Sequence, residues 1–221
     1  MEILDWLFIG ALSAAILFLV LALVYFVLIF VNSSKVKKMK QTKPKKKKKR
    51  KRWRRACRML EKKKSASIRS FVLFFVLASL GGGTAFYARY YQATNLGKED
   101  SEALIQGYYL IANIEEQLNQ IPGTDNPKKI QGNIYDLSAR LANYGVRTAD
   151  GRLSAEGQKD LNRLYANMKE LGLNLGSQTI ETLSDQTTLE AYQADLEKTK
   201  TNQKKVFEHF RINEDSLKKN K

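Results

Sequence analysis

Hydrophobic residues follow two patterns along this chain of 221 residues, and the first consists of two long apolar runs. Residues 6–31 contain no charged side chain, and neither do residues 70–88, which Arg69 and Arg89 enclose. At 1.5 Å of rise per residue, helices of these lengths extend about 39 Å and about 28 Å, against a hydrocarbon core of roughly 30 Å. A helix in a soluble core rarely lacks a polar face for so long. The runs therefore predict two transmembrane helices, at 6–31 and 70–88.

The second pattern begins after these runs and is amphipathic. From residue 89 onward, apolar positions recur every three or four residues, which is typical of helices with one buried face. Turn signals divide these positions into four stripes. Their members are Leu104, Tyr108, Ile111, Ile114, Leu118 and Ile121; Ile130, Ile134, Leu137, Leu141 and Tyr144; Leu161, Leu164, Met168 and Leu171; and Leu189, Tyr192, Leu196, Thr199, Gln203, Val206 and Phe210.

Capping signals predict where the later helices begin and end. Asn126 precedes the second stripe and Ser154 the third, and both residue types are favoured at helix amino termini. Thr187, with Glu190 three residues later, has the spacing of a capping box for the fourth helix. Gly172 follows the last apolar residue of the third stripe, which predicts that the third helix ends there.

These elements predict an all-α protein in which a transmembrane hairpin is joined to an antiparallel bundle of about four helices. No alternating pattern of strand length is present, and the last residues are polar enough to be disordered. The predicted segments are a short amino terminus (1–5), a first transmembrane helix (6–31), a polybasic loop (32–69), a second transmembrane helix (70–88), an extracytoplasmic helical domain (89–211) and a disordered tail (212–221).

The formal charge of +16 is concentrated in one segment and predicts the orientation of the chain. Residues 33–70 contain 20 Lys or Arg and a single acid, Glu61, whereas residues 71–221 carry 18 basic and 19 acidic side chains. Short loops rich in Lys and Arg stay on the cytoplasmic side of a membrane. We therefore expect a two-span cell-membrane protein with a cytoplasmic basic loop and with both termini outside.

Aromatic residues at the ends of the apolar runs predict where the chain meets the membrane surface. Trp and Tyr are enriched at the two membrane–water interfaces, and an Arg there reaches the headgroups. The expected interface anchors are Trp6, Tyr87, Arg89, Tyr90 and Tyr91.

The basic loop carries more charge than orientation requires, which predicts a second role in binding anions. Polybasic segments beside a membrane attract anionic headgroups by roughly 1 kcal/mol per Lys or Arg near the surface. Trp53, Ala56, Cys57 and Leu60 fall on one face of a helix, which predicts a short basic amphipathic helix in the headgroup plane. The expected anionic-lipid contacts are Lys45, Lys46, Lys47, Lys48, Lys49, Arg50, Lys51, Arg52, Trp53, Arg54, Arg55 and Arg58.

Two other ligands fit the basic loop by charge. An acidic protein partner is the second interpretation. A nucleic acid is the third and least favoured, in which Lys and Arg neutralise phosphates and Trp53 stacks on a base.

Side chains that carry chemistry are scarce. With one cysteine, Cys57, and one histidine, His209, the chain has neither a disulfide framework nor a Cys/His metal site. The three glycines at 81–83 lack the Lys and Ser/Thr of a phosphate-binding loop. Neither apolar run contains a charge, which argues against ion or proton transport by this chain alone. The sequence thus predicts a protein that is not an enzyme and that has no cofactor, metal or small-molecule substrate.

The architecture and composition resemble those of Gram-positive bacterial cell-envelope proteins. The expected function is a non-enzymatic membrane adaptor or scaffold, in a secretion, conjugation or wall-assembly complex. Its partners are the anionic lipids of the inner leaflet and a protein bound by the outer helical domain. The alternative is a membrane-anchored regulator or immunity-type protein whose outer bundle senses or sequesters a ligand.

Overall fold

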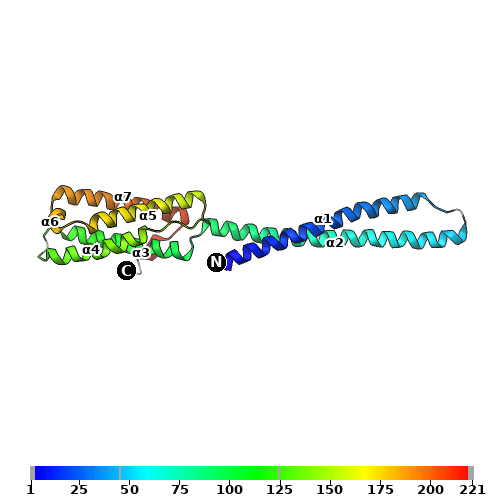
Figure 1. The fold of residues 1–221 in the computed structure, drawn as a ribbon, viewed down its shortest axis with the longest axis horizontal. Coiled ribbons are helices and arrows are strands. Elements are labelled where there is room, and N and C mark those ends of the chain that lie inside the picture. Colours follow the sequence, from blue (N-terminus) through cyan, green and yellow to red (C-terminus); the bar gives the residue numbers. More distant parts are fainter. Residues whose placement is uncertain (1–2, 45, 124, 219–221) are drawn as a thin grey trace. The chain divides into compact units, whose positions relative to one another are not determined.

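The structure, a computed structural model, describes residues 3–44, 46–123 and 125–218, and all its regular elements are helices (Figure 1). The chain divides into two compact units, Met1–Tyr90 and Tyr91–Lys221, each described here by itself. The all-α prediction is confirmed, since the described residues contain no strand. The helices are α1 (Ile3–Gln41), α2 (Lys47–Thr94), α3 (Lys98–Gln120), α4 (Pro127–Gly145), α5 (Ala155–Gly176), α6 (Ile180–Leu183), α7 (Gln186–Phe210) and α8 (Glu214–Lys218).

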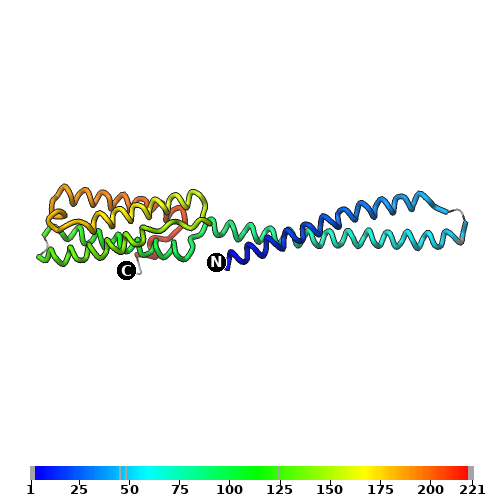
Figure 2. The backbone as a smooth tube through the Cα atoms, in the orientation of Figure 1, coloured from blue at the N-terminus to red at the C-terminus, as the bar shows by residue number. Residues whose placement is uncertain are grey.

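The first unit is formed by α1 and α2, and the two helices run antiparallel (Figure 2). Both are long and apolar enough to cross a membrane. In the most apolar window of each helix only 11% of the residues are buried, so most of the apolar side chains face outward. Such a surface differs from that of a core helix in a soluble protein, where the apolar side is covered.

One face of α1 packs against one face of α2 along a seam with alternating steps of three and four residues. This 3.5-residue period is that of a coiled coil. Phe18 and Phe74 stack with ring centroids 6.1 Å apart, and Tyr25 lies 5.5 Å from the same Phe74 ring. The buried and half-buried seam positions are Leu4, Phe8, Ala11, Ala15, Phe18, Ala22, Tyr25, Ile29, Asn32, Val36 and Met39 on α1, and Trp53, Cys57, Leu60, Lys64, Ser67, Phe71, Phe74, Ala78, Gly81, Ala85 and Ala88 on α2.

The seam changes character along its length. Around Ala11 and Ala15 of α1 and Ala78 and Gly81 of α2 it is made of small residues, so that the two backbones approach closely. A Cβ atom at Gly81 would lie 3.1 Å from the Ala11 carbonyl oxygen and 3.2 Å from the Ala15 Cβ. Toward the end of α1 the seam contains aromatic rings and then a polar pair, in which Asn32 Nδ2 donates to Ser67 Oγ at 3.1 Å.

The segment 32–69, which the sequence predicts to be a loop, is helical in its described residues except at 42–44 and 46. Helix α1 continues from its apolar run to Gln41, and α2 begins at Lys47. Like charges four residues apart destabilise a helix, which favours the loop when the segment is considered alone. The seam opposes this repulsion, because Val36, Met39 and Leu60 continue the apolar face past the end of both runs.

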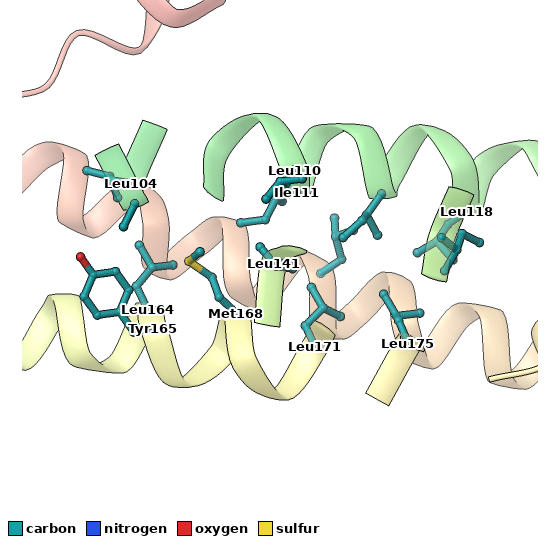
Figure 3. Packing of buried hydrophobic residues seen from close by; sticks show 14 of the residues in the cluster. Leu104, Leu110, Ile111, Leu118, Leu141, Leu164, Tyr165, Met168, Leu171 and Leu175 are labelled. Carbon is teal, nitrogen blue, oxygen red and sulfur yellow. The ribbon is translucent and has the colours of Figure 1, made fainter. Parts of the chain in front are cut away.

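The second unit is a bundle of four long helices around one apolar core. Helix α4 packs between α3 and α5, and α7 closes the ring by contacting α5 and α3. The core residues project inward from all four helices, and Figure 3 shows this for Leu104 and Leu118 of α3, Leu141 of α4 and Met168 and Leu175 of α5. Every apolar residue of the four predicted stripes is buried or packs against this core, which agrees with the amphipathic pattern.

Two of the predicted helix starts are confirmed and two boundaries are corrected. Asn126 accepts a hydrogen bond from Lys129 N (3.2 Å), and Ser154 accepts one from Gly157 N (3.1 Å). Helix α7 is capped by Asp185 rather than by Thr187, because the Asp185 carboxylate accepts a hydrogen bond from Thr188 N at 2.9 Å.

Helix α5 does not end at Gly172 but continues to Gly176, and the reason is a close helix crossing. A Cβ atom at Gly172 would lie 2.5 Å from the Ser138 carbonyl oxygen and 2.7 Å from Ala142 N of helix α4. The glycine is therefore needed for backbone approach and not for a left-handed cap.

The tail differs from the disordered segment that the sequence predicts. Residues 214–218 form α8, and Ile212 and Leu217 pack against the core of the bundle. Tyr109 donates a hydrogen bond from its hydroxyl to the Leu217 carbonyl at 3.0 Å. A few apolar contacts thus order a segment whose composition alone is polar.

We predict that a larger side chain at Gly81 separates α1 from α2, whereas the same change at Gly82 does not. The Gly81→Ile side chain would collide with the Ala11 backbone, while nothing lies within 4 Å of the Cβ position at Gly82. Spin labels at the exposed residues Val20 and Val76, in a cysteine-free background, measure the separation of the helices. Gly81→Ile should lengthen and broaden the distance distribution, and Gly82→Ile should leave it unchanged. Equal effects of the two variants would place Gly81 outside the seam.

We also predict opposite effects of two glycine-to-alanine changes in the bundle. Gly172→Ala should destabilise it by about 1–3 kcal/mol, because the new methyl group overlaps the backbone of α4. Gly132→Ala should stabilise it by about 0.5–1 kcal/mol, since Gly132 is exposed inside α4 with open space around its Cβ position. Hydrogen exchange of α4 and α5 peptides in the full-length protein measures both changes. A stabilising effect of Gly172→Ala would contradict the close crossing.

Candidate functional site

The most strongly charged surface of the chain lies at the beginning of α2. We call residues 46–55 the basic tip. Every exposed side chain that the structure describes in the basic tip is Lys or Arg. Successive helical residues point about 100° apart, so these cations surround the helix instead of forming one flat face. Of the expected lipid contacts, Lys45 and the side chain of Lys48 lie outside what the structure describes, and Arg58 lies three residues beyond the tip and is also exposed.

The apolar face of this helix is covered by α1. Trp53 donates a hydrogen bond from Nε1 to the Met39 carbonyl at 2.9 Å, and the Cys57 side chain is buried. Ala56 and Leu60 are half-buried. The expected amphipathic helix is therefore present, but its apolar side contacts protein where the sequence predicts contact with the headgroup plane.

One ion pair joins the two helices below the basic tip. Lys40 Nζ lies 2.8 Å from Glu61 Oε1. The hydrogen bond and charge of Glu61 raise the pKa of Lys40, and the hydrogen bond and charge of Lys40 lower the pKa of Glu61. Since Glu61 is the one acid in residues 33–70, this contact has no substitute of opposite charge within the basic segment.

The polar pair Asn32–Ser67 marks the end of the apolar part of the hairpin. We call its position the Asn32–Ser67 level and measure the distance of each charge along the helix from it. It is the first polar contact between the helices beyond the apolar run of α1, and Ser67 also donates from its hydroxyl to the Lys63 carbonyl at 3.0 Å. At 1.5 Å per residue, Arg55 lies about 18 Å and Lys47 about 30 Å along α2 from Ser67. The structure thus separates the cations near this level, such as Lys62 and Lys63, from those of the basic tip.

The expected interface anchors are exposed in the structure. Trp6, at the beginning of α1, is 66% exposed. Tyr87, Tyr90 and Tyr91 lie at helical steps of three and one near the end of α2, where each is at least 43% exposed, and Arg89 between them is also exposed. Exposed aromatic residues therefore lie at the start of the first apolar run and at the end of the second, which is compatible with the predicted interfacial position.

The second unit contains a cavity of about 380 Å³ between α3, α7 and α8. Lys200 in its wall is paired with Glu115 (2.9 Å) and with Glu197 (2.7 Å). Gln203 is 4% exposed, and its Nε2 has no hydrogen-bond partner among the described residues. Gln203, a polar position of the fourth stripe, thus lines the wall of the cavity, and its unpartnered amide donor is buried behind that wall.

A buried carboxylate in the second unit has a structural role. Asp100 accepts hydrogen bonds from the Tyr165 hydroxyl at 2.8 Å and from Asp150 N at 3.0 Å. Burial raises the pKa of Tyr165, and the bond to Asp100 adds to that shift, so the phenol stays protonated as a donor. The arrangement joins α3, α5 and the 150–151 turn. Within the residues that the structure describes, no group of three or more His, Cys, Asp or Glu side chains is placed to hold a metal ion.

We predict that the Lys40–Glu61 pair holds the basic tip against α1. In Glu61→Lys, repulsion replaces attraction and the beginning of α2 should fray, which would be measured as a several-fold faster tryptic cleavage of the full-length protein at residues 46–55. The exchanged pair Lys40→Glu with Glu61→Lys restores opposite charges and should restore slow cleavage. If the exchanged pair is cleaved as fast as the single variant, the ion pair does not hold the tip.

Comparisons of the chain with protein-family models, with curated proteins and with solved structures found no match. The function is therefore argued from the two features that the structure defines. These are a hairpin with an apolar outer surface and a basic tip, and a separate helical bundle with a polar cavity.

Proposed function

We propose that the chain is a non-enzymatic membrane adaptor of the cell envelope. In this proposal the hairpin of α1 and α2 crosses the membrane, the basic tip lies in the cytoplasm, and the helical bundle lies outside and binds another protein. The observation that carries the proposal is the outward-facing apolar surface of α1 and α2, which ends where the basic segment begins.

A lipid environment accounts for the exposed side chains of the hairpin. Large apolar residues such as Leu17, Val24 and Phe75 are more than half exposed, although the seam already uses one face of each helix. In water such a surface favours aggregation, whereas hydrocarbon solvates it. Lys and Arg next to the apolar runs favour retention of the hairpin connection inside the cell, which supports an outer position of Tyr91–Lys221 in this proposal.

The lipid-contacting role belongs best to the cations near the Asn32–Ser67 level. Lys35, Lys62, Lys63 and Arg69 lie within about 8 Å of that level along their helices, within reach of headgroups. The tip residues, where the sequence predicts this contact, lie farther away. We therefore propose that the membrane-proximal cations bind anionic lipid and that the outer bundle provides the protein-binding surface.

A second candidate function is a membrane-anchored regulator that senses a ligand. The cavity between α3, α7 and α8 favours it, because the buried Gln203 amide lacks a partner there. If the Gln203 side chain turned its amide into the cavity, a bound carbonyl or carboxylate would satisfy that donor. In this alternative the bundle responds to the ligand, whereas in the adaptor it serves for assembly.

We predict that single cysteines in a Cys57→Ser background report opposite sides of the membrane. Tyr135 is 64% exposed in the bundle, and Lys47 is exposed at the beginning of α2. A membrane-impermeant maleimide should label Tyr135→Cys in intact cells, and should label Lys47→Cys only in inverted vesicles. The reverse pattern would overturn the proposed orientation.

Mild-detergent purification of the full-length protein tests the adaptor role itself. An adaptor should retain a stoichiometric protein partner, and a chain lacking residues 98–218 should lose it while remaining in the membrane. Recovery of the chain without a partner would contradict the adaptor role. If Gln203→Leu also abolished the response of the bundle to its ligand, the regulator would be favoured instead.

A further inference from the structure

Most of the basic tip, from Lys47 to Arg52, lies beyond the reach of the membrane that anchors it. This step rests on the proposed function, in which α1 and α2 cross the bilayer. The headgroup layer adds about 5–8 Å to each side of the hydrocarbon core, and electrostatic attraction is screened over about 8 Å at physiological salt. Anionic lipids therefore act over roughly 15 Å. Along α2 the residues from Arg52 to Lys47 lie about 22–30 Å from the Ser67 level. A helix tilt of about 40° still leaves Lys47 about 23 Å away.

The fold gives the basic tip no means of folding back onto the membrane. Residues 47–80 contain neither glycine nor proline, and α2 is one unbroken helix through them. The Trp53–Met39 hydrogen bond and the Lys40–Glu61 ion pair fasten this part of α2 to α1. The charges are thus held away from the lipid on a stiff support, where they are free to bind another polyanion.

The surface of the basic tip suits a phosphate backbone better than an acidic protein. Protein–protein interfaces are depleted of Lys and are built on an apolar or aromatic core. In the tip the aromatic side chain, Trp53, is turned to α1, and the described exposed side chains are all cationic. Interfaces with nucleic acids are strongly positive, and sequence-independent binding rests on Lys and Arg contacts to phosphates.

We propose that the basic tip binds the phosphodiester backbone of a nucleic acid on the cytoplasmic side of the membrane, without sequence preference. The Trp53 indole is engaged in the seam, so the contact is made by cations and not by base stacking. This reverses the order of ligands expected from the sequence, in which nucleic acid ranks last. The reason is the distance between the tip and the lipid, which the sequence does not show.

The length of the tip sets the expected salt dependence of the affinity for a duplex. The ten residues of the tip cover about 15 Å, and a duplex carries one charge per about 1.7 Å of its axis. A duplex segment of 15 Å therefore carries about nine charges. About half of them face the tip, which gives four or five phosphate contacts. The logarithm of the affinity should therefore fall with the logarithm of salt concentration at a slope of about −4. Between 50 and 200 mM salt this is a loss of about 250-fold.

The test uses the full-length protein in phosphatidylcholine nanodiscs and a fluorescent 30-base-pair DNA duplex of random sequence. Fluorescence anisotropy measures the affinity as a function of salt. The tip variant replaces five cations by glutamine: Lys46→Gln, Lys47→Gln, Lys49→Gln, Lys51→Gln and Arg52→Gln. The matched control makes five membrane-proximal changes: Lys35→Gln, Lys37→Gln, Lys38→Gln, Lys62→Gln and Lys63→Gln.

The tip variant should lose at least 30-fold in affinity at 100 mM salt, and the control variant less than fivefold. Equal losses in the two variants would overturn the proposal, because the site would then be the net charge of the hairpin. Tighter binding of a polyglutamate peptide of equal charge than of the duplex would also overturn it, in favour of an acidic protein partner.

The outcome is separable from that of the proposed function. If maleimide labelling places the tip inside the cell and the duplex does not bind, only the nucleic-acid proposal fails. If labelling places the tip outside, the adaptor orientation fails and the cytoplasmic role of the tip fails with it, whatever the nanodisc result.

Discussion

The seam between α1 and α2 is the contact on which the first unit depends. Its period of 3.5 residues continues without a break from small residues near Ala11 and Gly81, through aromatic rings, to the Trp53–Met39 hydrogen bond. A segment with so many adjacent cations repels itself and has little reason to be helical when isolated. Packing against a second helix stabilises the helical conformation. The charged part of the hairpin is therefore ordered because it continues the seam of the apolar part.

The two units pack their helices in different ways. In the hairpin, apolar side chains face outward as well as inward, and close approach comes from alanine and Gly81. In the bundle the apolar side chains are gathered in one core, and Gly172 allows α4 and α5 to cross closely. The bundle also retains buried polar groups. Asp100 is fully engaged by Tyr165 and Asp150, whereas the buried Gln203 amide has no partner among the described residues.

Local patterns predicted much of the fold and less of the candidate site. The four apolar stripes and the caps at Asn126 and Ser154 were correct, because each depends on neighbours within one or two helical turns. Gly172 was mistaken for a helix end because a glycine that permits close packing has the same local appearance as one that caps. The sequence does not reveal the heptad in the hairpin because, within a continuous apolar run, the seam residues do not differ in polarity from their neighbours.

By itself the sequence determined where the charged and the apolar residues lie along the chain, and hence that two membrane-length helices flank a cationic segment. Those properties belong to composition and need no partner. The tertiary structure decided which side of the cationic helix is covered and how far its charges extend from the last apolar level. Both depend on contacts between residues far apart in sequence, such as Asn32 with Ser67 and Lys40 with Glu61, which periodicity alone does not pair.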